Sequence, residues 1–385
     1  MRFLHLGDLH LGKSLGDFDL IGDQKYILDQ MLAVIRERTV DAVLIAGDVY
    51  DKAIPSEAAT NLLDYFLCRL AETGVKTFLI SGNHDSDDRL NYGSRLFQDN
   101  QIFISSVFRG ELEKYTVEDE QGEVDVYLLP FVKASQVRHY FPDAKIDSYD
   151  DAVRVIIEHA HLDRQKRNVI VAHQFVAGRS EDPVLAGSES IGTQSVGLVE
   201  KISYDCFDPF DYVALGHIHR PQKMGRETLR YSGTPLKYSF SEVDHKKSVT
   251  IVELLEKGNV QINTVPLVPM RDMRKVRGTY MEVTAKESYT AENKMDYLQI
   301  TLTDEEDVPG ALQKLRTIYP NLMRLEYDNK RTRENREVQA VEAQEQKSEL
   351  ELFGEFYELL NNEPMKEEQT EFMERLIQNL KEVQA

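Results

Sequence analysis

The sequence predicts a layered α/β fold with largely parallel strands. Short apolar or β-branched runs alternate with helical patterns from residue 3 onward, which is typical of this class. Polar residues follow directly on several of the apolar runs, as they do where a site lies at the carboxyl ends of parallel strands. The 41% of hydrophobic and 29% of charged residues are ordinary for a globular protein.

The first 80 residues supply three expected strands and two expected helices. Strands are expected at 3–6, 42–45 and 75–80, where apolar runs are short and bounded by polar residues. Helices are expected at 20–38 and from 55 or 56 to 72. The second helix has an apolar face at helical spacing, made of Leu62, Leu63, Phe66, Leu67 and Leu70.

The following stretch continues the same domain. Strands are expected at 102–104, 124–129, 169–172, 212–215, 229–232 and 248–254, with a helix near 149–161. A chain of 385 residues suggests two or three compact units. We therefore expect the main domain to span 1–268.

The rest of the chain reads as appendages. Residues 269–330 are expected to form a small α+β domain, with strands at 278–283 and 297–302 and a helix at 308–319. Residues 331–348 are almost purely polar, which favours a solvated linker. Apolar residues return at helical spacing in 349–385, which predicts two amphipathic helices.

Charge and cysteine content narrow the possible settings. Cys68 and Cys206 are the only cysteines, so neither a disulfide framework nor a cysteine zinc site is expected. The sequence shows no signal peptide or apolar stretch long enough to cross a bilayer, which favours the cytoplasm and no membrane partner. The net charge of −20 argues against DNA binding, but residues 337–385 alone carry 13 acidic and 4 basic residues. Basic residues cluster elsewhere, at 220–247 and 271–277.

Asp, Asn and His stand at the ends of five expected strands. The segments are Asp8-Leu9-His10, Asp48 to Asp51, Asn83-His84-Asp85, His173 and His217-Ile218-His219. Residues separated by one position at a strand end point the same way, so a carboxylate and an imidazole can converge on one ion. Taken alone, any one of these segments is also consistent with a polar loop or a helix cap. The ordered set of carboxylates and imidazoles, without thiolates, indicates manganese, iron or zinc.

This set of motifs (DxH, GDxxD, GNHD, a lone His and GHxH) resembles that of the calcineurin-like metallophosphoesterases over residues 8–219. The resemblance implies a two-sheet sandwich flanked by helices, an α/β/β/α arrangement. It also implies two divalent ions, with Mn²⁺ typical of the nuclease branch. One ion would be held by Asp8, His10 and His219, and the other by Asn83, His173 and His217. Asp48 would bridge both.

Two further residues are candidates for the chemistry. His84 follows a ligand without being needed as one, and imidazole suits proton donation near neutral pH, so we expect it to assist the leaving oxygen as a general acid. Asp51 falls where phosphatase relatives have an aspartate that pairs with this histidine. It reads equally well as a helix cap before Pro55.

A narrower resemblance is to the bacterial SbcD-type nucleases. It rests on the segments GNHDS at 82–86, HQF at 173–175, GSE at 187–189, GHIHRPQ at 216–222 and YSGTPLKYSFSE at 231–242. It implies a 3′–5′ exonuclease at double-strand DNA ends that also cuts hairpins or single strands endonucleolytically. The nuclease would work with an SbcC-type ATPase in DNA repair, recombination and replication.

The same resemblance assigns the appendages. The small domain would cap the site, and the two tail helices would bind the coiled coil of the ATPase. Helices at 55–72 and 88–97 would form a homodimer contact within a heterotetramer, although their apolar residues read equally well as ordinary core.

The basic residues after the last ligands are candidates for DNA binding. We expect Arg220, Lys223, Arg230, Lys237 and Lys246 to hold the DNA backbone, unless they are simply a solvated charged surface. Two rival functions use the same fold: a phosphomonoesterase or cyclic-nucleotide phosphodiesterase, and a catalytically inactive scaffold. The capping domain, basic runs and tail argue against the first, and the full set of ligands argues against the second.

Overall fold

The computed structural model describes residues 1–178, 181–189, 201–290 and 293–330, with single residues at 332, 353, 357, 365, 369, 370 and 373. The linker and tail helices expected over 331–385 therefore lie outside the described residues, those single positions aside. The chain divides into two compact units. One comprises Met1–Val276, Thr284–Ile300 and Leu312–Leu325, and the other comprises Arg277–Val283, Thr301–Ala311 and Glu326–Ala385. The domain boundaries expected from the sequence stay predictions.

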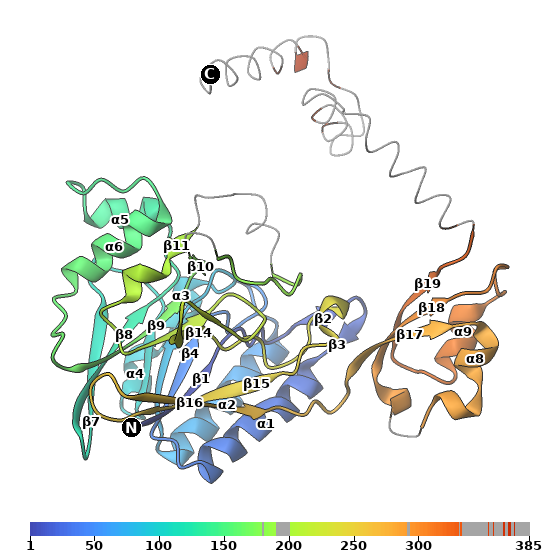
Figure 1. Ribbon diagram of the computed structural model, residues 1–385, viewed down its shortest axis with the longest axis horizontal. Coiled ribbons are helices and arrows are strands. Elements are labelled where there is room, and N and C mark those ends of the chain that lie inside the picture. The colour runs from blue at the N-terminus through green and yellow to red at the C-terminus, as the bar shows by residue number, and fades with distance from the viewer. Residues whose placement is uncertain are drawn as a thin grey trace. The chain divides into compact units, whose positions relative to one another are not determined.

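The first unit is built on two six-stranded sheets (Figure 1). The first sheet has the order β16-β15-β1-β4-β5-β6. Its strands are β16 (Val260–Pro266), β15 (Ser248–Leu254), β1 (Arg2–Leu6), β4 (Ala42–Ala46), β5 (Lys76–Ile80) and β6 (Ile102–Ser105). Strands β1, β4, β5 and β6 are parallel to one another, while β15 runs antiparallel to β1 and to β16.

The second sheet has the order β13-β14-β12-β9-β8-β7. Its strands are β13 (Gln222–Met224), β14 (Arg226–Tyr231), β12 (Tyr212–Gly216), β9 (Arg167–His173), β8 (Gly122–Leu129) and β7 (Glu113–Asp119). The four central strands are parallel, and the edge strands β13 and β7 run antiparallel to their neighbours. The expectation of largely parallel strands is confirmed for the centre of each sheet.

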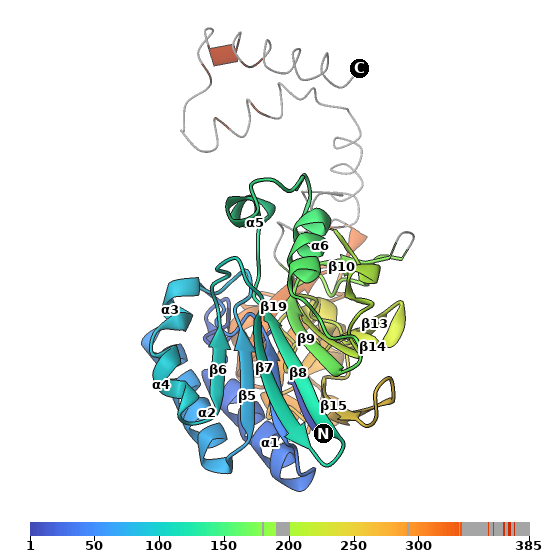
Figure 2. The same ribbon diagram turned by 90° about the vertical axis from the view of Figure 1, so that its left-hand side faces the viewer.

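The two sheets pack face to face, with helices on both outer faces (Figure 2). Alternate residues of each strand divide between the layers. Phe3, Leu44 and Phe78 of the first sheet meet Val171 and Tyr212 of the second in the inner core. Helices α1 (Ile21–Glu37) and α2 (Glu57–Thr73) cover the outer face of the first sheet, and α5 (Ala134–Tyr140) and α6 (Tyr149–His159) that of the second. The expected α/β/β/α sandwich is confirmed.

Short elements complete the description. Two small sheets pair β2 (Ser14–Leu15) with β3 (Phe18–Asp19) and β10 (Val176–Ala177) with β11 (Ile202–Ser203). Helices α3 (Asp87–Asn91) and α4 (Ser94–Gln98) lie between β5 and β6. The 3₁₀ turns are η2 (Tyr204–Phe207), η3 (Phe240–Glu242), η4 (Lys286–Ser288) and η5 (Asn293–Met295). No helix of the described residues is long and apolar enough to span a membrane.

The last described part is α+β, as expected, but one of its elements was predicted wrongly. Strands β17 (Met273–Gly278), β18 (Tyr297–Leu302) and β19 (Leu322–Tyr327) form a sheet, accompanied by α8 (Tyr280–Thr284) and α9 (Ala311–Arg316). The strand expected at 278–283 is instead the end of β17 followed by α8. Thr279 and Glu282 explain the helix, because each side chain accepts a hydrogen bond from the other's backbone N–H, at 3.3 and 2.7 Å. This reciprocal pair is the capping box that starts a helix.

Candidate metal centre

The predicted ligands gather at one edge of the sandwich, where the parallel strands of both sheets end. Asp8 and His10 follow β1, Asp48 follows β4, Asn83 follows β5, and His217 and His219 follow β12, while His173 is the last residue of β9. The imidazole Nδ1 of His173 lies 2.8 Å from the carbonyl oxygen of Ala46 and so ties the two sheets together. The whole predicted ligand set shares this edge.

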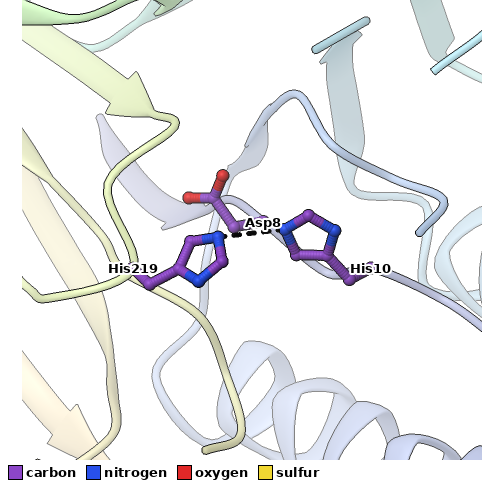
Figure 3. Close-up of side chains that lie close together, drawn as sticks. All are labelled: Asp8, His10 and His219. Atoms are coloured by element: carbon purple, nitrogen blue, oxygen red, sulfur yellow. Dashed lines mark hydrogen bonds between the residues drawn. The ribbon is translucent and has the colours of Figure 1, made fainter. Parts of the chain in front are cut away.

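Asp8, His10 and His219 form the first group of donors. All three are buried, and their ligand atoms lie within 4.8 Å of one another. Nε2 of His10 and Nε2 of His219 are 3.1 Å apart. Figure 3 shows the two rings pointing toward each other, one from the loop after β1 and one from the loop after β12, with Asp8 beside them. The geometry provides two nitrogens and a carboxylate for one ion.

Asp48 lies between this group and the remaining ligands. Its Oδ2 is 3.6 Å from Nε2 of His10, and its Oδ1 is 3.5 Å from Nε2 of His173. The Oδ1 atom of Asn83 lies 3.1 Å from Nε2 of His173 and 2.9 Å from Nδ1 of His217. Asp48 can therefore reach both sets of donors, as a bridging carboxylate must.

The edge carries buried polar atoms without partners and unusual backbone conformations. Asp8 Oδ2 and His10 Nδ1 are buried and have no hydrogen-bond partner among the described residues. Burial raises the pKa of Asp8. Asp8, His10, Asp48 and His217 have positive φ values of 53°, 44°, 47° and 101°. Such conformations cost about 1–3 kcal/mol each and cluster at functional sites. The oxygen and nitrogen donors fit a pair of divalent cations that would satisfy the unpartnered carboxylate.

Burial also determines the ionisation of the imidazoles. It lowers the pKa of His10 to about 4 and that of His217 to about 3, and it lowers the pKa of His219 well below its usual range. Burial opposes the charged form of His173 as well, but Asp48 outweighs it and raises the pKa of His173 to about 9. Burial would raise the pKa of Asp48, yet the neighbouring His173 holds it well below its usual range. Three of the four imidazoles are thus neutral near pH 7, which is the form that binds a metal.

His84 is the more open imidazole at this edge. Its side chain is 24% exposed, and its Nε2 lies 4.0 Å from Asp48 Oδ2. Its backbone N–H donates to Asp48 Oδ1 at 2.9 Å, and its Nδ1 lies 2.9 Å from the carbonyl oxygen of Asp51. The carboxylate of Asp51 pairs with Lys13 at 2.7 Å, and the same oxygen lies 3.7 Å from Nδ1 of His10. Asp51 therefore contacts His84 through its backbone, and the side-chain pairing that the resemblance suggested is absent from this structure.

Several supporting residues escaped the sequence reasoning. The carboxylate of Asp85 is buried and accepts hydrogen bonds from the backbone N–H groups of Val49, Tyr50 and Gly82, at 2.8–3.0 Å. It thereby locks the Asp48 loop to the Asn83 loop, and burial raises its pKa to about 7. The available signal was its place in the GNHD motif. Ser188, Glu189, Glu242 and Lys247 lie around His219.

The five predicted DNA contacts differ in exposure. Arg220 and Lys246 are exposed, and Lys223 is 55% exposed and paired with Glu227. The side chain of Lys237 is only 12% exposed and bonds to Asp272 and to the carbonyl oxygen of Val243. That of Arg230 is 13% exposed. Basic character in the sequence therefore overstates the positive surface beside the ligands.

Comparisons with known proteins agree with this architecture. Residues 1–221 match the model of the calcineurin-like phosphoesterase family, and residues 269–360 match a model described as the type 5 capsule protein repressor C-terminal domain. The chain is 35% identical to the SbcD component of the nuclease SbcCD from Staphylococcus epidermidis over 328 residues, which are 84% of this chain and 85% of that protein.

Solved structures match with lower similarity. A dimetal phosphatase from Danio rerio is 13% identical, with a TM-score of 0.36, over 70% of this chain and 99% of that one. A Thermus thermophilus protein is 10% identical, with a TM-score of 0.39, over 68% of this chain and 98% of that one.

The sandwich and its edge of carboxylates and imidazoles define a phosphoesterase, and the chain belongs to the calcineurin-like phosphoesterase family. Within that family, its 35% identity over most of both chains places it with the SbcD component of the SbcCD nuclease.

Proposed function

We propose that this chain is a dimetal-dependent DNA nuclease subunit that works with an SbcC-type ATPase. The observation that carries the proposal is the largely buried edge where seven donor side chains, from Asp8 to His219, converge from both sheets. The 35% identity to a component of the SbcCD nuclease supports DNA as the substrate. We further propose action at double-strand ends, hairpins and single strands, in the cytoplasm, for repair, recombination and replication.

We assign the donors to two ions, proposed to be Mn²⁺. Asp8, His10 and His219 would hold one, Asn83, His173 and His217 would hold the other, and Asp48 would contribute to both sites. When bound, the ions supply Lewis acidity to the phosphodiester and to the attacking water, and neutralise charge on the attacking and leaving oxygens. His10, His217, His219 and the ionised Asp48 are already in the protonation states that such ions require, whereas His173 would release a proton on binding.

His84 is proposed as the general acid. The carbonyl oxygen of Asp51 accepts from Nδ1–H, which leaves Nε2 facing the ligand edge at 4.0 Å from Asp48 Oδ2. A proton on Nε2 can be given to the leaving oxygen, and the partial exposure of the side chain lets solvent restore it. Asp51 contributes through its backbone oxygen, while its carboxylate and Lys13 close the edge beside His10.

The DNA backbone is proposed to lie over the segments after the last ligands. Arg220, Lys223 and Lys246 are exposed there and suit phosphate contacts, which carry no sequence preference. The largely buried Arg230 and Lys237 would support this surface from beneath.

Two protein contacts complete the proposal. The tail at 349–385 would bind the ATPase, and deletion of 345–385 should abolish partner co-purification while leaving metal-dependent hydrolysis of a small phosphodiester.

A homodimer would form over α3 and α4, where Tyr92 is 87% and Leu96 is 73% exposed. The apolar residues of α2 are mostly buried in the core, so α3 and α4 carry this part of the proposal. Sedimentation of the full chain as a monomer at every concentration would contradict the dimer.

The deciding experiment compares wild type with Asp48→Ala on linear duplex, hairpin and single-stranded DNA. We expect wild type to bind two Mn²⁺ per chain and to cleave DNA only when metal is present. Asp48→Ala should lose both ions and essentially all cleavage, because both sites share this carboxylate. DNA cleavage that survives chelation would contradict the dimetal proposal, whereas hydrolysis confined to phosphomonoesters or cyclic nucleotides, or no hydrolysis at all, would point to the rival functions.

A further inference from the structure

A buried chain of hydrogen bonds lies behind His219, on the side away from His10. Ser188 Oγ is 2.7 Å from His219 Nδ1 and 2.5 Å from Glu242 Oε1. Glu242 is fully buried, and its other oxygen forms an ion pair with the buried Lys247. Lys247 Nζ also donates to Thr234 Oγ1 at 2.6 Å and to the carbonyl oxygen of His219 at 3.2 Å. Figure 3 shows the opposite side of the same imidazole ring facing His10 and Asp8.

The chemistry of this chain fixes the direction of each hydrogen bond. A carboxylate paired with a lysine only accepts, so the single hydroxyl hydrogen of Ser188 is donated to Glu242. Ser188 Oγ must then accept from Nδ1–H of His219. The remaining nitrogen, Nε2, therefore carries a lone pair, and it points at Nε2 of His10 from 3.1 Å. This is the tautomer that a metal ligand needs.

The segments around this chain are themselves held in place. One oxygen of Glu189 accepts from the backbone N–H groups of His219 and Ala186, at 3.1 and 2.9 Å, and the other accepts from Gly187 at 2.8 Å. The loop that carries Ser188 is thereby tied to the loop that carries His219. The arrangement joins the partly buried Ser188 to the buried side chains of Glu189, Glu242 and Lys247.

The other imidazoles of the ligand edge are oriented differently. Nδ1 of His173 bonds to the backbone oxygen of Ala46, and Nδ1 of His10 has no hydrogen-bond partner among the described residues. Of the ligand histidines in the described part of the chain, His219 is the one held by a serine that ends on a buried ion pair. Its orientation can therefore be altered by changing a side chain that is not itself a ligand.

We propose that Ser188 and Glu242 are positioning residues, which fix the tautomer and ring orientation of His219 and so set the affinity of one of the two ion sites. The inference rests on the proposed function, because it concerns the site formed by Asp8, His10 and His219. Residues that orient a ligand histidine typically account for a 10- to 100-fold effect on metal affinity. The metal affinity of the site formed by Asn83, His173 and His217 should stay unchanged.

The test is a titration of metal-free full-length protein with Mn²⁺ alone, followed by calorimetry and by electron paramagnetic resonance. In Ser188→Ala, we expect one of the two sites to weaken by about 10- to 100-fold while the other keeps its wild-type affinity. At two equivalents of Mn²⁺, the spectrum of a coupled ion pair should give way to that of isolated ions. Ser188→Thr keeps the hydroxyl and should restore both readouts.

Two further variants keep the test decisive. Ser241→Ala removes an exposed hydroxyl from a neighbouring segment and should titrate like wild type. Glu242→Gln removes the charge that orients Ser188 and should weaken the same site as Ser188→Ala. The melting temperature without metal will show whether Ser188→Ala is folded. If the folded variant binds two ions with wild-type affinities, the proposal is overturned. A wild-type chain that never binds two ions would instead overturn the proposed function.

Discussion

The two ends of the β-sandwich differ in how their charged side chains are paired. At the end where the parallel strands finish, four proposed ligand residues have positive φ values, and buried polar atoms of Asp8 and His10 lack partners among the described residues. At the end where they begin, the same two sheets are closed by satisfied charges. Arg167 donates to both carboxylate oxygens of Asp119 and to the carbonyl oxygens of Gly122, Leu254 and Leu255. The amino group of Met1 joins the same carboxylate.

This difference separates function from stability within one scaffold. The positive φ values of Asp8, His10, Asp48 and His217 and the unpartnered atoms of Asp8 and His10 lower stability, and they persist because the surrounding sheets hold them there. The opposite end stabilises the sandwich and touches no ligand. Substitutions at the ligand end should therefore change chemistry with little loss of stability, whereas substitutions at the other end should do the reverse.

His84→Gln should give the largest effect, a loss of DNA cleavage without a loss of bound metal. Loss of a general acid lowers the rate by about 10²- to 10⁴-fold, so DNA cleavage should fall by that factor. Metal content should stay at two ions, because His84 is not in the proposed ligand set. His159→Gln, an exposed histidine of α6, is the matched control and should cleave like wild type. Cleavage by His84→Gln at the wild-type rate would remove this residue from the mechanism.

The sequence predicted the ligand end better than the residues that support it. The central strands β1, β4, β5, β9 and β12 are buried on both faces, so their apolar runs are continuous and their ends are easily read. Polar residues immediately after such runs could therefore be recognised as candidate ligands. The edge strand β7 was missed because it is rich in charged residues and only partly buried, as edge strands commonly are.

Contacts between residues far apart in the sequence could not be predicted from local patterns. Glu242 and Lys247 support His219 although they lie more than 20 residues away in sequence, and nothing local marks a charged residue as buried. The same limit affected Lys237 and Arg230, which were predicted as DNA contacts from their charge and their place after the last ligands, yet their side chains are 12% and 13% exposed. Exposure follows from the packing of the two sheets, which a local pattern does not contain.

Arg167→Met tests the stabilising end. Its side chain is 4% exposed, so its loss leaves carbonyl oxygens and the Asp119 carboxylate short of donors. We expect chemical denaturation at pH 7 to show a loss of about 2–3 kcal/mol, with the number of bound ions unchanged. Lys166→Met, which removes the neighbouring partly exposed lysine paired with Glu123, should change stability far less than Arg167→Met.

The effect of Arg167 should also depend on pH. Arg167 holds the pKa of Asp119 well below its usual range. A depressed carboxyl pKa stabilises the folded state above the unfolded pKa of about 3.9, and the benefit is lost as pH falls toward the folded pKa. The difference between wild type and Arg167→Met should thus be full at pH 7 and shrink below about pH 4. A difference that grows on acidification would contradict this account of the ion pair.

The smallest expected effect concerns DNA binding at the ligand end. Replacement of both Arg220 and Lys246 by Ala removes two exposed positive charges beside the last ligands. The slope of log K against log salt should decrease in magnitude by about 1–2, and binding should weaken equally for all DNA sequences. The charge-matched control is Lys166→Ala with Lys257→Ala, two partly exposed lysines at the opposite end. An equal loss of salt dependence in both double variants would show that net charge, and not the surface beside the ligands, governs binding.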